Sequence, residues 1–148
     1  MKKIRELALR LVQKYAVTSP FELCDSLAVN IFRCELPEHM DGVSFQTEEN
    51  ISVILLNRDL GKIESRYCCA HELGHVMLHP GLNALSVEEH TFLSVPRFEH
   101  EADYFAACLL IEPFLTEWNE RYEALTAEQI SCLSGLPLKV VQLWAANR

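Results

Sequence analysis

Two amphipathic helices are predicted at the start of the chain. Apolar side chains recur at helical spacing over residues 2–15 and share one face: Ile4, Leu7, Leu11 and Tyr15. Ser19 then precedes Pro20 and Glu22, a typical helix start with an N-cap residue, a proline at the first helical position and an acidic residue in the first turn. The second helix should run from there to about Ala28.

After the second helix, the pattern changes to a period of two, which is typical of strands. Residues 29–34 and 43–47 alternate apolar and polar positions, and residues 51–56 are almost wholly apolar. Turn-forming residues at 40–42 and 48–50 separate these segments. The simplest arrangement is a small three-stranded antiparallel sheet.

Helical spacing returns in the second half of the chain. Helices are predicted over residues 62–79, 97–111 and 114–124, with a loop or lid over 82–96. The tail over 126–144 divides at Gly135 and Pro137 into two short helices, which resembles a small helix-turn-helix. The fold class is therefore α+β, and we expect a main domain over residues 1–124 and a helical tail over 125–148.

Composition places the chain among soluble globular proteins. Of its 148 residues, 49% are apolar and 23% are charged. The net charge of −8, with no basic run, disfavours broad DNA binding. No apolar run approaches the roughly 18 residues of a membrane helix, and Arg5, Glu6 and Arg10 interrupt the stretch where a signal peptide would be apolar. We therefore expect a cytoplasmic chain whose six cysteines, with no C-x-x-C pair, stay reduced.

The strongest chemical signal is an H-E-x-x-H motif from His71 to His75 on a predicted helix. Residues four apart lie one above the other on a helix, so these two imidazoles can bind one Zn²⁺ from a single face. Glu72 points about 100° round the helix from His71. It can reach a water molecule held by the metal, which is the position of a general base in metal-assisted hydrolysis.

A catalytic zinc site also needs a third protein ligand and one open position. The longer zincin pattern with a third histidine is absent, because Gly81 occupies that position. The next predicted helix offers Glu99, with Asp103 on the same face to orient a zinc-binding imidazole. Glu101 lies about 200° from Glu99 and is expected to face solvent, whereas the small Ala106 should let the two helices approach on the Glu99 side.

The two motifs together resemble the ImmA/IrrE family of zinc metallopeptidases, whose members read H-E-x-G-H and then E-x-[EQ]-A-[ND]-x-F-A-A. Here the motifs occupy residues 71–75 and 99–107, and the resemblance extends over roughly residues 2–113. It implies a gluzincin-like minimal fold with the metal between two helices. It also implies cleavage of a helix-turn-helix repressor that controls a phage, a mobile element or a stress response. The chain departs from the pattern at Asp103, where Asn is commoner, and by an inserted Glu112, which concerns only the helix end.

Four further histidines carry weaker signals. His79 lies eight residues after His71 and is expected to have a structural role, such as capping the helix C-terminus. His39, His90 and His100 are candidates for stabilising the oxyanion of a tetrahedral intermediate. The sequence does not choose among these three.

One cysteine falls on the face of the proposed metal ligands. Cys68 precedes His71 by three residues and His75 by seven. It is either a thiol close to zinc that makes the site redox-sensitive, or a buried apolar residue. We favour the buried residue.

Three functions remain to be weighed. The leading hypothesis is a zinc endopeptidase in which Glu72 activates water and the substrate is a separate protein, such as a helix-turn-helix repressor. The second is a non-catalytic, metal-containing module that docks a repressor, and it differs from the first in not depending on Glu72. The third is a transcription factor acting through residues 126–144. It is disfavoured by the net charge of −8 and by the presence of a single lysine, Lys139, in that segment.

Overall fold

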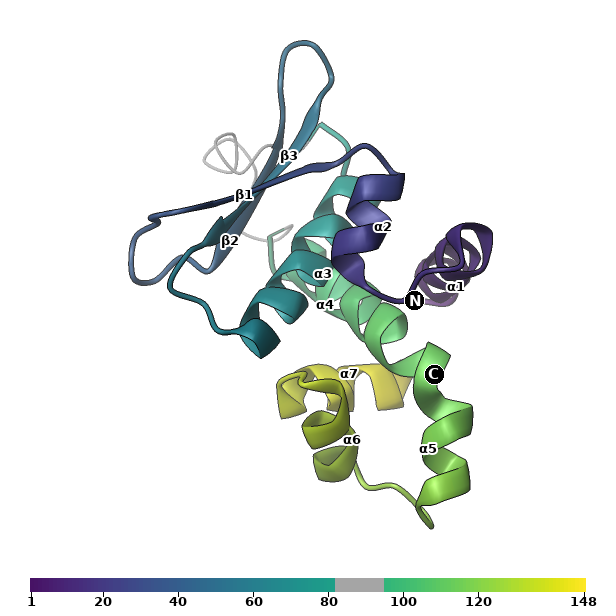
Figure 1. Cartoon of the computed structure of the whole chain (residues 1–148). Helices are drawn as coiled ribbons and strands as arrows, with labels where there is room; N and C mark the ends of the chain where they lie inside the picture. Colours follow the sequence, from purple (N-terminus) through teal and green to yellow (C-terminus); the bar gives the residue numbers. More distant parts are fainter. Residues whose placement is uncertain (82–94) are drawn as a thin grey trace.

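The computed structural model describes residues 1–81 and 95–148 (Figure 1). In chain order its helices and strands are α1 (Lys2–Tyr15), α2 (Pro20–Ser26), β1 (Asn30–Cys34), β2 (Gly42–Gln46), β3 (Ser52–Asn57), α3 (Lys62–Leu78), α4 (Val95–Ile111), the 3-10 helix η2 (Glu112–Phe114), α5 (Leu115–Arg121), α6 (Ala127–Ser134) and α7 (Leu138–Asn147). This confirms the predicted α+β class and most element positions. The predicted loop over 82–96 lies largely outside the described residues, and α4 begins at Val95.

The three strands form a mixed sheet in the order β1-β3-β2. β2 pairs with β3 antiparallel, as predicted, but β1 pairs with β3 parallel, so the fully antiparallel sheet was wrong. Strands joined by short turns alternate in direction, and β1 and β3 therefore point the same way. They become neighbours because β3 takes the centre of the sheet, where its side chains Val53, Ile54 and Leu56 are buried.

Helix α3 lies against the sheet and α4 packs on the other side of α3 (Figure 1). α4 also contacts α1 and α7, so almost every side chain from Ala102 to Ile111 is buried. A helix that is apolar nearly all round is expected at the centre of a domain. The start of β2 comes very close to α3 at Gly42, because a Cβ there would lie 2.5 Å from the Sγ of Cys68.

The tail packs on α4 through a set of large apolar side chains. Val140, Val141 and Trp144 of α7 are buried and belong to the same hydrophobic cluster as the α4 side chains. Thr126 and Gln129 form a reciprocal capping box at the start of α6, and Gly135 ends that helix with a φ of 74°. By contrast, Ser19 occupies the N-cap position of α2 but makes no side-chain capping bond.

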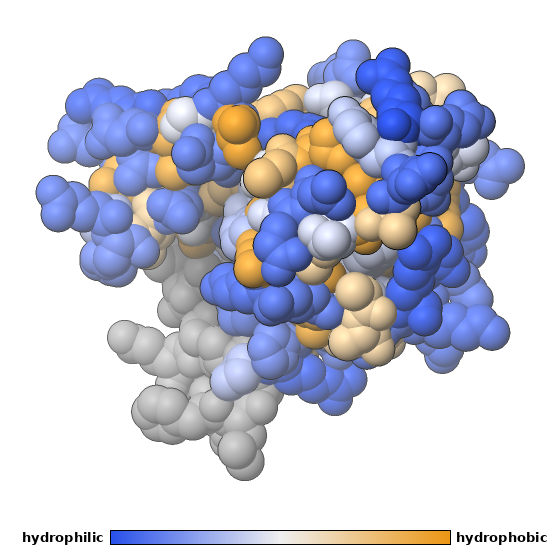
Figure 2. All heavy atoms as spheres, turned by 90° about the horizontal axis from the view of Figure 1, so that it is seen from below, coloured by the Kyte–Doolittle hydropathy of each residue, from blue (hydrophilic) through white to orange (hydrophobic). Residues whose placement is uncertain are grey.

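The tail end of the molecule has a largely polar surface with apolar side chains between the charged ones (Figure 2). The exposed large apolar residues at this end are Tyr122, Leu133 and Leu138. Within the part of the chain that the structure describes, no helix is both long enough and apolar enough to cross a membrane.

Candidate metal centre and active site

His71 and His75 lie one turn apart on α3 and direct their Nε2 atoms toward each other, 3.1 Å apart. The carboxylate of Glu99 on α4 reaches both, with Oε2 3.2 Å from Nε2 of His71 and Oε1 3.2 Å from Nε2 of His75. The structure thus brings together the three residues that the two sequence motifs single out. Glu99 is half exposed, with 51% of its side chain accessible, so the cluster opens to solvent.

A close contact between Gly74 of α3 and Ala102 of α4 sets the distance between these two helices beside the cluster. A Cβ on Gly74 would lie 3.0 Å from the Cα of Ala102 and 3.2 Å from its carbonyl oxygen. The close approach was predicted at Ala106, but Gly74 meets Ala102, one turn nearer to Glu99. This contact allows a carboxylate on α4 to reach the two imidazoles on α3.

The donor atoms of this cluster fit a metal ion. Tetrahedral zinc with bonds of about 2.0–2.1 Å places neighbouring donor atoms about 3.3–3.4 Å apart. The two Nε2 atoms are 3.1 Å apart, and each lies 3.2 Å from a different carboxylate oxygen of Glu99, Oε2 for His71 and Oε1 for His75. Two imidazole nitrogens and one carboxylate oxygen are also ligands that zinc accepts, with one position left open. His71, His75 and Glu99 therefore match a metal site in both chemistry and spacing.

The ring nitrogen of His71 that is not in the cluster, Nδ1, is hydrogen-bonded to the carboxylate of Asp103, which also accepts from the phenol of Tyr67. Nδ1 of His71 donates to Oδ1 of Asp103 at 2.8 Å, and the hydroxyl of Tyr67 donates to the same oxygen at 2.6 Å. Burial lowers the pKa of His71, but hydrogen bonds to Asp103 and Glu99 outweigh it and raise that pKa to about 10. Burial would raise the pKa of Asp103, and hydrogen bonds from His71 and Tyr67 lower it overall. Asp103 thus lies where its sequence spacing placed it, whereas no pattern indicated Tyr67.

His79 and Glu101 form a second pair beside the cluster, and here the prediction was wrong. Glu101 was expected to face solvent, but its side chain is only 20% exposed, less than that of Glu99. Its Oε2 lies 3.0 Å from Nε2 of His79, and its Oε1 accepts from Arg97 at 2.8 Å. His79 is the C-cap residue of α3, as expected, and its backbone N–H donates to the carbonyl of His75 at 2.9 Å. Its side chain is buried and contacts the ring of His75. Glu101 can be largely buried because the ring of His79, on α3, gives its carboxylate a hydrogen-bond partner.

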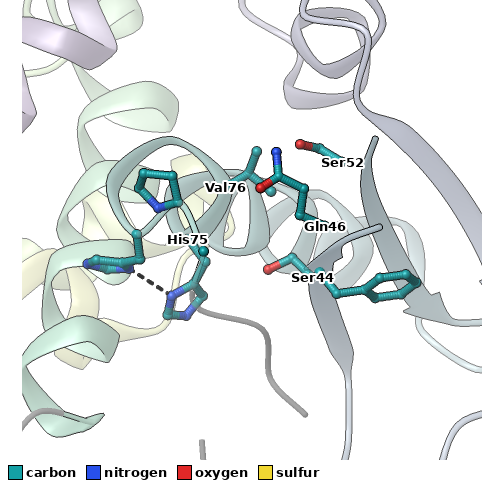
Figure 3. A pocket seen from close by; sticks show the side chains of 9 residues that line it. Ser44, Gln46, Ser52, His75 and Val76 are labelled. Carbon is teal, nitrogen blue, oxygen red and sulfur yellow. Dashed lines mark hydrogen bonds between the residues drawn. The ribbon is translucent and has the colours of Figure 1, made fainter. Parts of the chain in front are cut away.

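Glu72 lies on the side of α3 that faces the sheet. It is buried, and a Cβ on Gly42 of β2 would lie 3.4 Å from its Cγ. Ser44 and Gln46 of β2 and His75 of α3 line a small hollow of about 30 Å³, in which Figure 3 shows their side chains facing one another. Glu72 itself does not line this hollow, but its charge raises the pKa of His71, so its carboxylate lies within electrostatic range of that imidazole.

A larger cleft of about 670 Å³ opens on the other side of the cluster. This volume is in the range of sites that bind small molecules or side chains. Its lining combines α3, α4 and α7: Tyr67, His71, Pro96, Glu99, His100, Asp103, Lys139, Gln142 and Leu143. Of the three oxyanion candidates, His100 lines this cleft, His39 is exposed on the β1–β2 loop, and His90 lies outside the described residues.

Cys68 does not join the metal donors. Among the described residues, the cluster of metal-binding side chains consists of His71, His75 and Glu99. Cys68 is buried against Gly42, and burial raises the pKa of its thiol to about 12. A thiol held protonated in this way is a poor zinc ligand and a poor target for oxidation, which favours the interpretation as a buried apolar residue.

Comparison with known proteins gives the family. Residues 24–135 match the family model of the IrrE N-terminal-like domain, a family of peptidases. The chain belongs to the ImmA/IrrE family. It is 30% identical to "uncharacterized immunity region protein 2" of Bacillus phage phi105, over 95% of this chain and 87% of that protein. It is also 24% identical to metallopeptidase ImmA of Bacillus subtilis, over 92% of this chain and 80% of that protein. ImmA/IrrE membership makes this chain part of a metallopeptidase family, in agreement with the His71, His75 and Glu99 cluster.

Proposed function

We propose that this ImmA/IrrE member is a zinc-dependent endopeptidase. His71, His75 and Glu99 would hold the ion, Asp103 would orient His71, and Glu72 would be the general base. The observation that carries the proposal is the convergence of three metal-binding side chains from two helices, with nitrogen and carboxylate oxygen atoms 3.1 to 3.2 Å apart. The buried Glu72 is close enough for its charge to raise the pKa of His71.

The reaction would be hydrolysis of a peptide bond. A zinc ion supplies Lewis acidity, which polarises the carbonyl of the scissile bond and makes water acidic enough to react at neutral pH. Glu72 accepts a proton from the attacking water and passes it to the leaving amine nitrogen. Asp103 keeps the hydrogen of His71 on Nδ1, so that Nε2 presents its lone pair to the ion.

The position of the edge strand β2 is an argument that the substrate is a protein. In the sheet formed by the described residues, β2 is an edge strand that pairs with β3. Ser44 and Gln46 of this strand line the same hollow as His75. An extended segment that adds to β2 by main-chain hydrogen bonds would therefore pass the metal donors.

We propose a helix-turn-helix repressor as the substrate class. The resemblance to the ImmA/IrrE family implies such a target, and the similarity to an immunity region protein of a phage agrees with it. Cleavage would then relieve repression of a phage, a mobile element or a stress response. The alternative is a non-catalytic module that regulates a repressor by binding it.

The test is Glu72→Gln, which keeps the shape of the side chain and removes its basicity. Co-expression with repressors encoded beside this chain identifies the substrate by the appearance of a cleavage product. We expect the variant to retain zinc and to lose at least about a hundredfold in cleavage rate, the typical contribution of a general base. Cleavage at the wild-type rate would refute the assigned mechanism, and relief of repression without cleavage would favour the binding module.

A further inference from the structure

A chain of polar contacts runs from His75 away from the cluster and ends at a carboxylate. Nδ1 of His75 lies 3.1 Å from Nδ1 of His79, and Nε2 of His79 lies 3.0 Å from Oε2 of Glu101. Arg97 occupies the other carboxylate oxygen of Glu101 at 2.8 Å. The side chain of His79 is only 4% exposed, and its ring packs on Phe98 with 4.5 Å between the ring centroids. Both rings are therefore held in place by neighbours from α4.

The carboxylate at the end of the chain sets the direction of every hydrogen bond in it. An ionised carboxylate only accepts, so Nε2 of His79 must donate to Glu101. A neutral His79 then has a lone pair on Nδ1, which accepts the hydrogen on Nδ1 of His75. The remaining nitrogen of His75, Nε2, consequently carries a lone pair, and it points at His71 and Glu99.

The two imidazoles of the cluster are thus oriented by different means. His71 donates directly to a carboxylate, Asp103, at 2.8 Å. His75 reaches a carboxylate only through a second imidazole. The opposite tautomer of His79 would place a hydrogen on its Nδ1, force Nδ1 of His75 to accept it, and leave Nε2 of His75 protonated and unable to bind a metal.

We propose that His79 and Glu101 are positioning residues that fix the tautomer and ring orientation of His75 for metal binding. The inference rests on the proposed metal site and adds two residues to it. Hydrogen-bond partners of metal-binding histidines typically contribute about 10- to 100-fold to metal affinity. The contribution of Glu101 requires an acceptor atom and not a negative charge.

Metal affinity measured against a competing chelator, with no substrate present, tests this proposal. We expect His79→Ala and Glu101→Ala to weaken zinc binding by about 10- to 100-fold. Glu101→Gln should stay within about threefold of wild type, because its amide oxygen can still accept from His79. The visible absorption of the cobalt-loaded protein should change in Glu101→Ala and stay like that of wild type in Glu101→Gln.

Glu112→Gln is the matched control, because it also removes a buried carboxylate from a hydrogen-bonded pair, eleven residues further along the chain. It should lower stability and leave both zinc affinity and the cobalt spectrum unchanged. Wild-type affinity in both His79→Ala and Glu101→Ala would overturn the inference. So would equal weakening in Glu101→Gln and Glu101→Ala, or equal weakening in the control. Absence of zinc binding by the wild-type protein would instead refute the proposed function.

Discussion

Replacing Gly74 by Ala tests how the metal centre is assembled. Gly74 lies in the middle of α3, where glycine lowers helix stability relative to alanine by about 0.5–1 kcal/mol. On propensity alone, the substitution should stabilise the protein. The structure predicts the reverse, because the new Cβ would lie 3.0 Å from the Cα of Ala102 and 3.2 Å from its carbonyl oxygen.

The size of the destabilisation depends on which atoms the new Cβ of residue 74 would contact. Both belong to the backbone of α4, so no side-chain rotation can relieve the contact and α4 itself must move by a few tenths of an ångström. Overpacking of this kind costs about 1–3 kcal/mol. After the gain in propensity, a net destabilisation of roughly 1 kcal/mol, and at most about 2.5 kcal/mol, remains. Glu99 lies three residues before Ala102, and metal–ligand distances tolerate only about 0.2 Å, so zinc affinity should fall by about tenfold.

Chemical denaturation of the metal-free protein and chelator competition measure the two effects separately. Gly61→Ala is the control, because the nearest atom to its Cβ is the carboxylate end of Glu64, which can rotate away. This control should cost at most about 1 kcal/mol at the helix N-cap and leave zinc affinity unchanged. A Gly74→Ala protein that is more stable than wild type and binds zinc equally well would refute the role of this contact.

Three further outcomes follow from the contacts. Glu99→Ala removes one of three donors and should weaken zinc binding by more than about a hundredfold, measured by chelator competition. Glu112→Gln should cost about 2 kcal/mol at pH 7. Burial raises the pKa of Glu112, but the hydrogen bonds from Arg5 and Trp144 and the charge of Arg5 together lower it overall. The stability is therefore complete above the ordinary pKa of Glu, about 4.3, and is lost as the pH falls through the lowered value, where the free energies of unfolding of the two proteins should converge. Cys68→Ser should leave zinc affinity and peroxide sensitivity within about twofold of wild type, because the thiol is held protonated.

Local patterns were sufficient for most of the elements and for the clustering of His71, His75 and Glu99. H-E-x-x-H spacing on one helix fixes how far apart His71 and His75 can lie, and the helical period decided between Glu99 and Glu101 as the residue facing them. Asp103 followed from the same period, one turn after Glu99. These are relations within a single helix, which the sequence expresses directly.

Contacts between different helices and strands could not be predicted from these local patterns. The parallel pairing of β1 with β3 depends on which strand takes the centre of the sheet. The burial of Glu101 depends on His79, which comes from another helix 22 residues earlier. An acidic residue at a predicted solvent-facing position can be buried wherever a partner compensates its charge, and nothing in the periodicity of α4 shows that partner.

The inserted Glu112 is the clearest example of a contact between different elements that no local pattern predicts. It lies just after α4, its side chain is only 6% exposed, and its Oε1 accepts from Nε of Arg5 at 2.7 Å and from Nε1 of Trp144 at 3.0 Å. Helices α1 and α7 are thereby both attached to the end of the helix that carries Glu99 near its start. Glu112 lies 13 residues, more than three helical turns, beyond Glu99, so these contacts anchor the far end of α4 and are remote from the metal donors. α4 is apolar nearly all round because it packs against α1, α3 and α7, whereas α3, which carries the histidines, packs against α2, the sheet and α4.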